Sequence, residues 1–115
     1  MTQFNMIENA KLVKKASRIV AQLTTSEKNH LLTAMAQAIE DTRDFIITEN
    51  AKDIEAGKEK GLSNAMLDRL LLTKQRIVDI ANAIREIVTL ADPVGNIANL
   101  TLRPNGMQVG KMRIP

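Results

Sequence analysis

Residues 73–93 of this chain read TKQRIVDIANAIREIVTLADP. Apolar residues recur here every three or four positions, which is the spacing of one face of an α-helix. Thr73 is a suitable cap for the helix start, and we predict a helix over Lys74–Ala91. Asp92-Pro93 ends it, because proline disfavours helical geometry in the residue before it. The apolar face consists of Ile77, Ile80, Ala81, Ile84, Ile87, Val88 and Ala91.

After this helix the periodicity changes from 3.6 to 2. Leu100–Arg103 alternates apolar and polar residues, and Met107–Ile114 provides a second strand. The intervening Pro104-Asn105-Gly106 suits a type I turn with glycine in the left-handed region, which is a common hairpin loop. A two-stranded hairpin is marginal alone in water, and its free edges invite another strand. The sequence therefore predicts a β-hairpin that has a partner.

Upstream of residue 73, two long apolar patterns also have helical spacing. The first predicts a helix over Asn5–Leu23. Thr24 with Glu27 three residues later forms the pattern of a capping box, so a second helix begins there. Its apolar pattern either continues or bends near Asn50 into Ala51–Lys60.

Gly61 and Ser63 separate the second helical pattern from the helix that follows it. Gly61 is a natural helix stop, because glycine enters the left-handed region freely. Gly57 weakens the last turns before it. Ser63 is a suitable cap for a short helix over Asn64–Leu71. The expected fold class is mainly α, with a C-terminal β-hairpin.

The chain has few large side chains for a core. Phe4 and Phe45 are its only aromatic residues, although aromatic side chains usually dominate cores. This composition suits either an aliphatic core or a peripheral layer that packs on something else. We therefore expect exposed apolar patches on the helices and the hairpin. That expectation would be contradicted if four side chains of the last helix were fully buried within a monomer, namely Ile77, Ile80, Ile84 and Val88.

The distribution of charge argues against nucleic-acid binding. Residues 1–92 carry 13 basic and 13 acidic side chains, so the net charge of +3 comes from Arg103, Lys111 and Arg113. A nucleic-acid surface is normally a clustered basic stripe with stacking aromatics. The N-terminus lacks the pattern of a secretion signal, and no apolar run approaches the length of a membrane span. We expect no nucleic-acid partner, no membrane partner and a cytoplasmic location.

No nucleophilic centre is recognisable in the sequence. The chain has no cysteine, which also excludes a disulfide or a thiolate metal site. Ser17, Ser26 and Ser63 do not lie in a nucleophile-elbow motif, and the last two fit helix starts. His30 is interpreted as a surface side chain; the alternative is a serine–histidine pair.

Metal and phosphate sites are equally hard to place. Glu40-Asp41-Asp44 is interpreted as a solvated helix face near Arg43, with weak cation binding as the alternative. None of the five glycines forms a phosphate-binding loop. Asp92–Gly95 is interpreted as a helix-to-strand turn rather than a ligand loop. We therefore predict no catalytic, cofactor-binding or metal-binding residue in this chain.

A series of short stretches, taken in order, resembles the γ-glutamyl phosphate reductase family, also called glutamate-5-semialdehyde dehydrogenases. The resemblance runs from the first helix to the last residue. The stretches that carry it are Asn50-Ala51-Lys52-Asp53, Gly61-Leu62-Ser63, Met66-Leu67-Asp68-Arg69-Leu70, Leu72-Thr73, Arg76-Ile77, Asp92-Pro93-Val94-Gly95, Arg103-Pro104-Asn105-Gly106 and Arg113-Ile114-Pro115.

The resemblance implies an α/β enzyme of the aldehyde dehydrogenase type, several times longer than this chain. Members of the family reduce γ-glutamyl phosphate with NADPH to glutamate 5-semialdehyde and phosphate, on the route to proline. A cysteine thiolate displaces the phosphate, and the resulting thioester takes a hydride from the cofactor. In the family, this cysteine and the dinucleotide-contacting loops lie beyond the segment that matches here.

By the same resemblance, residues 1–92 correspond to a helical layer of the cofactor-binding domain. Residues 93–115 correspond to a connection and the β-hairpin of an oligomerisation arm. We expect an amino-terminal fragment that is inactive alone and binds no cofactor by itself. NADPH and the small-molecule substrate belong to the full-length enzyme, which forms a homo-oligomer through the hairpin. The alternative is a stand-alone helical module whose hairpin docks onto a partner protein.

Overall fold

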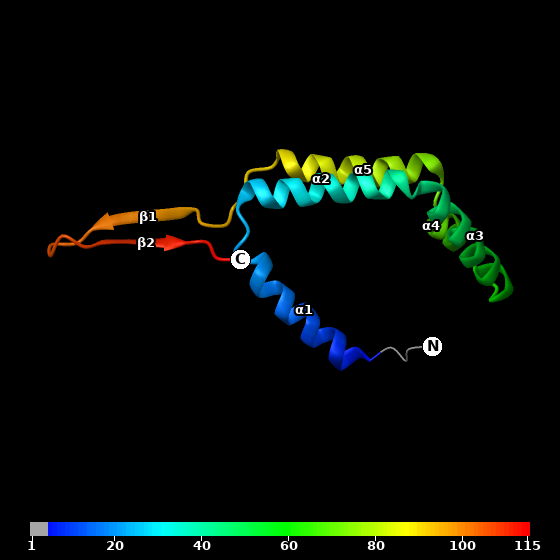
Figure 1. The fold of residues 1–115 in the computed structure, drawn as a ribbon, viewed down its shortest axis with the longest axis horizontal. Helices are drawn as coiled ribbons and strands as arrows, with labels where there is room; N and C mark the ends of the chain where they lie inside the picture. Colours follow the sequence, from blue (N-terminus) through cyan, green and yellow to red (C-terminus); the bar gives the residue numbers. More distant parts are fainter. Residues whose placement is uncertain (1–4) are drawn as a thin grey trace. The chain divides into compact units, whose positions relative to one another are not determined.

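The computed structural model describes residues 5–115, and Figure 1 shows its elements. The sequence-based fold class is confirmed, since helices are followed by a C-terminal hairpin. Residues 27–90 form one compact unit, and the described residues before and after them form another. The elements are α1 (Met6–Val20), α2 (Thr25–Asp41), α3 (Arg43–Glu59), α4 (Asn64–Leu70), α5 (Lys74–Thr89), β1 (Ile97–Leu102) and β2 (Gln108–Met112).

Helix α1 is capped by Asn5, whose side-chain oxygen accepts hydrogen bonds from the backbone amides of Ile7 and Glu8. The helix ends at Val20, earlier than the predicted Leu23. The amide of Leu23 bonds to the Val20 carbonyl three residues back, at 3.2 Å, so the chain tightens into a turn there. Helix α2 starts directly after Thr24, as the capping pattern predicts. The hydrogen bonds of that capping box stay a prediction.

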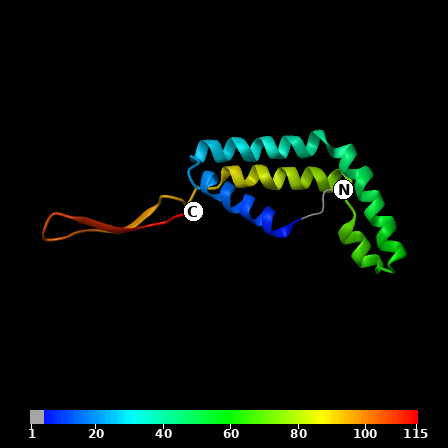
Figure 2. The ribbon, with the colours of Figure 1, turned by 60° about the horizontal axis from the view of Figure 1, so that its bottom comes forward.

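The second apolar pattern bends at Thr42 and then continues through Asn50, so of the two alternatives that the sequence left open, the bend near Asn50 is wrong. The Ala38 carbonyl accepts two hydrogen bonds from Thr42, one from the backbone amide at 3.0 Å and one from Oγ1 at 2.7 Å. Such back-bonding by threonine often bends a helix. Helix α3 therefore leaves in a different direction from α2 (Figure 2).

Helix α3 ends at Glu59, and Gly61 is the helix stop that the sequence predicts. Gly61 has a φ of +74°, its amide bonds to the Lys58 carbonyl, and the Leu62 amide bonds to the Gly57 carbonyl. This pair of bonds is the Schellman motif. Gly57 is buried, and a Cβ there would lie 3.0 Å from Leu67 Cδ2 and 3.1 Å from Leu62 Cδ1. Gly57 lowers the helix propensity of α3, but because it has no side chain it allows α4 to pack closely against α3.

The next two helices begin where their caps predict. Ser63 Oγ accepts from the Met66 amide at 3.4 Å, and Thr73 Oγ1 accepts from the Arg76 amide at 3.1 Å. Helix α4 ends at Leu70, one residue before the prediction, and α5 ends at Thr89 instead of Ala91. Leu90 is already extended, with φ −76° and ψ 147°, so the chain leaves the helix before it reaches Asp92-Pro93.

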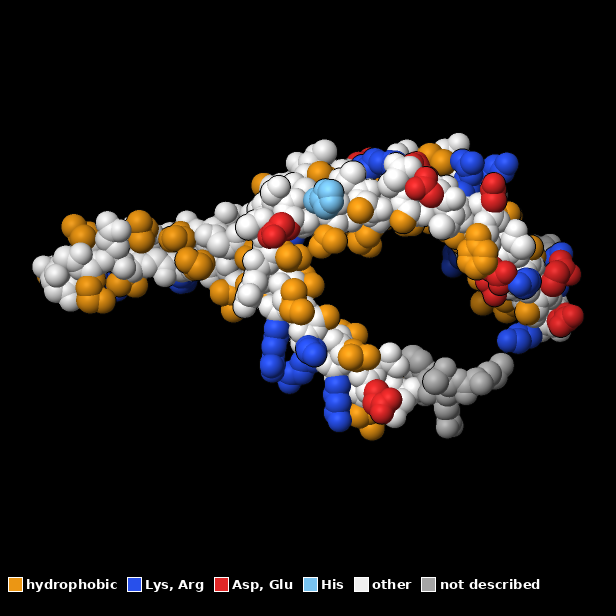
Figure 3. Space-filling view, viewed as in Figure 1, with side chains coloured by type: hydrophobic (Ala, Val, Ile, Leu, Met, Phe, Trp, Pro, Cys, Tyr) orange, Lys and Arg blue, Asp and Glu red, His pale blue; other side chains and the backbone are white. Residues whose placement is uncertain are grey.

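Helices α2 and α5 run antiparallel and side by side (Figures 1 and 2). The apolar residues buried within the described chain are few, namely Ala36 on α2 with Ile77 and Ala81 on α5. Ile80, in the middle of the same stripe, is 44% exposed. The expectation of exposed apolar surface on helices and hairpin is therefore confirmed, and Figure 3 shows such side chains over both.

Strands β1 and β2 pair antiparallel. The predicted turn is confirmed, since the Gly106 amide bonds to the Arg103 carbonyl at 2.9 Å and Gly106 has a φ of +85°. Strand β1 begins at Ile97, earlier than predicted, and a bulge between Ala98 and Thr101 interrupts its pairing with β2. Strand β2 ends at Met112 rather than Ile114. All residues of both strands are exposed.

Among the helices that the structure describes, none combines the length and the apolar character that a bilayer crossing requires.

Replacing Gly57 by valine should separate α4 from α3, because the new side chain overlaps the positions of Leu62 and Leu67. We expect a loss of roughly 1–3 kcal/mol in the free energy of unfolding, as for other overpacked sites. Urea denaturation followed by circular dichroism measures it. Ala56→Val is the matched control, because Ala56 is exposed on the same helix. An equal effect of the two substitutions would contradict the close-approach role of Gly57.

Candidate functional site

The side chains considered as nucleophiles or bases have structural surroundings. Ser17 Oγ donates to the Lys14 carbonyl at 2.7 Å within α1. Ser63 caps α4, as predicted, and Ser26 is exposed in the first turn of α2. His30 is exposed on α2, in agreement with its interpretation as a surface residue.

The acidic residues of α2 and α3 that were considered as cation ligands each contact a different side chain. Glu40 pairs with Arg85 of α5, Asp41 accepts from Gln37 Nε2 at 2.9 Å, and Asp44 lies 3.7 Å from Arg43. Nowhere in residues 5–115 do three or more histidine or carboxylate side chains gather as a cation would require. Asp41 and Asp44 fit the predicted solvated face, whereas Glu40 is only 26% exposed and pairs with another helix.

The segment Asp92–Gly95 is a helix-to-strand turn, as predicted. Asp92 Oδ1 accepts from the Val94 amide at 3.0 Å, and the Pro93 carbonyl accepts from the Asn96 amide at 3.2 Å. The Gly95 amide then bonds to the carbonyl of Arg113 at 2.8 Å, which starts the hairpin. The open hollow beside it is lined by Pro93, Val94, Met112, Arg113 and Ile114.

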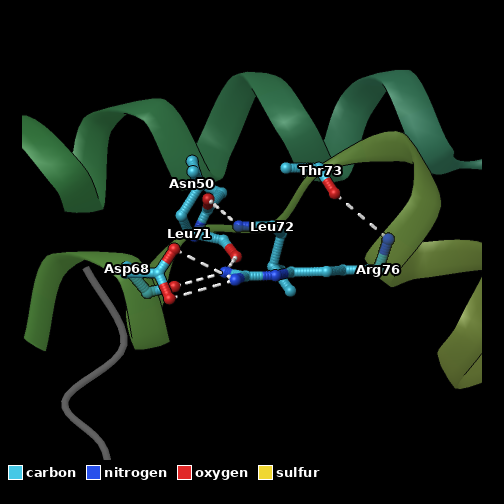
Figure 4. A network of polar contacts seen from close by, with 6 residues as sticks. All are labelled: Asn50, Asp68, Leu71, Leu72, Thr73 and Arg76. Atoms are coloured by element: carbon cyan, nitrogen blue, oxygen red, sulfur yellow. Dashed lines mark hydrogen bonds and ion pairs between the residues drawn. The ribbon is translucent and has the colours of Figure 1, made fainter. Parts of the chain in front are cut away.

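The most highly organised polar cluster lies where α3, α4 and α5 meet (Figure 4). Asn50 of α3 is 6% exposed and faces the connection between the other two helices. Its Nδ2 donates to the Leu70 carbonyl at 2.9 Å, and its Oδ1 accepts from the Leu72 amide at 2.7 Å. Two backbone groups that would otherwise lack a partner in a partly buried loop are thereby satisfied.

Arg76 of α5 holds the same connection from the other side (Figure 4). Its guanidinium donates to the carbonyls of Asp68 and of Leu71, the latter at 2.8 Å. The second guanidinium nitrogen lies 3.0 and 3.1 Å from the two carboxylate oxygens of Asp68. Arg76 thus caps the C-terminal carbonyls of α4 and neutralises the acidic side chain beside them.

This cluster, which we call the corner network, consists of Asn50, Asp68 and Arg76 with the backbone of residues 70–72. Its carboxylate is paired, and both the oxygen and the nitrogen of its side-chain amide are bonded, so it orders backbone and offers no free reacting group. The sequence reasoning assigned no role to these residues. A signal was present, because asparagine is a poor helix former and Asn50 lies inside a long helical pattern.

A second ion pair joins α2 to α5. Arg85 Nη2 lies 2.7 Å from Glu40 Oε2, and Nη1 lies 3.0 Å from Glu40 Oε1. This bidentate geometry is the strongest form of the carboxylate–guanidinium contact. The hydrogen bonds from Arg85 lower the pKa of Glu40, and the Coulomb attraction of Arg85 and Arg43 acts in the same direction. The hydrogen bond with Glu40 raises the pKa of Arg85.

Replacing Asn50 by aspartate should destabilise the helical unit. The aspartate keeps an acceptor for the Leu72 amide but has no donor for the Leu70 carbonyl, and it brings a charge into a buried position. We expect a loss of about 1–3 kcal/mol, measured by urea denaturation. Asn64→Asp, at the exposed start of α4, is the control. Equal stability of N50D and the unmodified chain would contradict the role of the corner network.

The Glu40–Arg85 pair should make stability depend on pH in a defined direction. Because the pKa of Glu40 is lower in the folded chain than its ordinary value of 4.5, the stabilisation is fully present above that value. It is lost as the pH falls through the folded pKa. The melting temperature of E40Q should therefore lie below that of the unmodified chain at neutral pH, and the two should converge in acid. A difference that persists unchanged in acid would exclude this titration as its cause.

Comparisons with known proteins place this geometry in a context. No family model matches the chain. The γ-glutamyl phosphate reductase of Colwellia psychrerythraea is 63% identical over 115 residues, which is the whole of this chain and 28% of that relative. The enzyme of the same name from Moorella thermoacetica is 52% identical over 102 residues, which is 89% of this chain and 24% of that relative.

A solved structure agrees with these sequences. The crystal structure of γ-glutamyl phosphate reductase from Thermotoga maritima matches with a TM-score of 0.92 and 31% identity. The match covers 95% of this chain and 26% of the solved one. The chain thus spans about a quarter of the length of the relatives it matches. In sequence and in fold, it is homologous to the amino-terminal quarter of the γ-glutamyl phosphate reductase family.

Proposed function

We propose that this chain is the amino-terminal part of an enzyme that reduces L-glutamate 5-phosphate to L-glutamate 5-semialdehyde with NADPH, in proline biosynthesis. The observation that carries the proposal is the 63% identity with a γ-glutamyl phosphate reductase over the whole of this chain. The catalytic cysteine belongs to the remainder of the enzyme, because this chain has none. The enzyme acts in the cytoplasm.

The residues present do not form a dinucleotide pocket by themselves. A pyrophosphate is usually bound by a glycine-rich loop between a strand and a helix. Of the glycines here, Gly57 and Gly61 belong to the end of α3, and the others lie in or beside the hairpin. The remainder of the enzyme therefore supplies the contacts to NADPH, which brings the hydride.

Two structural roles remain for this chain. Residues 1–92 form a helical layer of the cofactor-binding domain, and residues 93–115 form the connection and the hairpin of an arm that joins subunits. The very small core supports the first role, because the stripe around Ile77 on α5 has exposed members such as Ile80 and Ile87. The exposure of every residue in both strands supports the second role.

The alternative of a stand-alone interaction module is less favoured. An independent module needs a core of its own. Within the described residues, however, the buried apolar side chains are limited to Ala36, Ile77 and Ala81. Such a unit needs further apolar surface against it.

A chimeric enzyme tests the proposal. The segment of the Colwellia psychrerythraea enzyme that aligns with this chain is replaced by residues 1–115, and reductase activity is assayed. Because γ-glutamyl phosphate is labile, the reverse reaction is also followed as formation of NADPH from glutamate 5-semialdehyde, NADP and phosphate. We expect the chimera to turn over like the parent enzyme. We expect no turnover from the purified 115-residue chain or from the parent enzyme without the segment.

Two results would overturn the proposal. A soluble, folded chimera without activity would show that this chain does not perform the role of the segment it replaces. Turnover by the 115-residue chain alone would show that the reaction does not need a cysteine from the remainder of the enzyme.

A further inference from the structure

The turn of the hairpin contains a chemically reactive pair of residues, Asn105 and Gly106. Asn105 is the one asparagine in the sequence that is followed by glycine. The backbone nitrogen of the residue after an asparagine can attack the side-chain amide carbon, and a side chain on that residue hinders the attack. Glycine has no side chain and allows the close approach. Both residues are exposed to solvent, so water and hydroxide can reach them.

The reaction requires water and no other partner. The Gly106 nitrogen loses its proton to hydroxide and forms a bond to Cγ of Asn105. The bond from Cγ to Nδ2 then breaks, and Nδ2 takes a proton from water and leaves as ammonia. The product is a five-membered succinimide ring, which water opens at either carbonyl to give aspartate or isoaspartate. An amide and a water thus become a carboxylate and ammonium, and nothing is oxidised or reduced.

The closed turn engages the groups that must react. The Gly106 amide donates to the Arg103 carbonyl at 2.9 Å, so the proton that hydroxide must remove is held in a hydrogen bond. Oδ1 of Asn105 accepts from the Met107 amide at 3.1 Å, and Nδ2 lies 3.2 Å from the Met107 sulfur. The attacking nitrogen and the attacked side chain therefore both have other partners. We infer that the turn must open before the ring can close.

Opening of this hairpin should cost little free energy. Among residues 5–115, strands β1 and β2 form a sheet of two strands, and all their residues are exposed. A two-stranded hairpin is marginally stable in water. Segments with few buried apolar contacts and solvent-exposed backbone hydrogen bonds open locally far more often than the chain unfolds. The open form is thus accessible under conditions in which the helices stay folded.

Other asparagines have surroundings that disfavour the same reaction. Asn96 and Asn99 also belong to the hairpin segment, but Ile97 and Leu100 follow them and hinder the attack. Asn50 is buried, and its side-chain oxygen and nitrogen are both hydrogen-bonded within the corner network. Exposure, a following glycine and an easily opened backbone therefore coincide at the turn of the hairpin.

We propose that Asn105 is a site of spontaneous deamidation, and that opening of the hairpin turn controls the rate. The inference goes beyond the proposed function and does not depend on it. The product places an acidic side chain in a segment, residues 93–115, whose sequence contains three basic and no acidic side chains. Isoaspartate also adds a methylene group to the main chain inside the turn.

Incubation of the 115-residue chain at mildly alkaline pH tests the site. Peptide mapping by mass spectrometry follows the loss of each side-chain amide, and chromatography separates isoaspartate from aspartate. The same chain in urea gives the rate for the open hairpin. We expect Asn105 to lose its amide before any other asparagine, and to react faster in urea than in buffer. Earlier loss at another asparagine in buffer would overturn the proposed site.

Two substitutions separate opening of the turn from the chemistry of the pair. Val109 pairs with Thr101 beside the turn, and glycine there weakens the hairpin. We expect V109G to react about fivefold faster in buffer, the size of a full difference in strand propensity, and at an unchanged rate in urea. Gly106→Ala should slow the reaction in urea, because the methyl group hinders the attack. Val13→Gly is the matched control, since Val13 is exposed on α1.

Each comparison can contradict one part of the inference. Equal rates for V109G and the unmodified chain in buffer would overturn control by opening of the turn. Equal acceleration by V13G would assign the effect to general destabilisation and would overturn it as well. A rate for G106A in urea that matched the unmodified chain would exclude the attack by the Gly106 nitrogen. None of these results bears on the proposed function, which the activity of the chimera tests separately.

Discussion

The arrangement of helices α3, α4 and α5 depends on one side-chain amide. Asn50 donates a hydrogen bond to the Leu70 carbonyl and accepts one from the Leu72 amide. The side chain thus supplies the hydrogen-bond partners that a neighbouring strand would otherwise supply. The Leu70 carbonyl stands at the end of α4 and the Leu72 amide lies between the two helices, so neither group has a partner within a helix. With this connection held, Thr73 starts α5 at a defined point. The face that α5 presents to α2 follows from that starting point.

Other contacts reinforce the same corner. Arg76 binds the carbonyls at the end of α4, and Gly57 provides the space that lets α4 approach α3. Farther along α5, Arg85 pairs with Glu40 and ties α5 to α2. Polar and steric constraints therefore set this unit, since so few apolar side chains are buried. The stripe on α5 and the two strands of the hairpin keep apolar side chains exposed. This combination suits the structural role that we propose for the chain within the enzyme.

The hairpin shows the same principle on a smaller scale. Asn99 occupies a left-handed conformation, and Gly110 lies opposite with no side chain to occupy the space. The bulge brings Ile97, Leu100 and Leu102 to one face. An apolar face of this kind is a property of the pairing register. The alternation of residues in β1 alone would have distributed these three side chains over both faces.

The sequence by itself determined which segments are helical, the caps at Ser63 and Thr73, the stop at Gly61 and the turn at Gly106. Each of these depends on local chemistry, namely periodicity, a capping hydroxyl or a backbone that only glycine adopts without strain. The tertiary structure decided the partner of Glu40 and the role of Asn50. These depend on which of several possible partners a group meets in the folded chain. Asn50 is the clearest case, because its partners lie 20 and 22 residues away, where no local pattern indicates them.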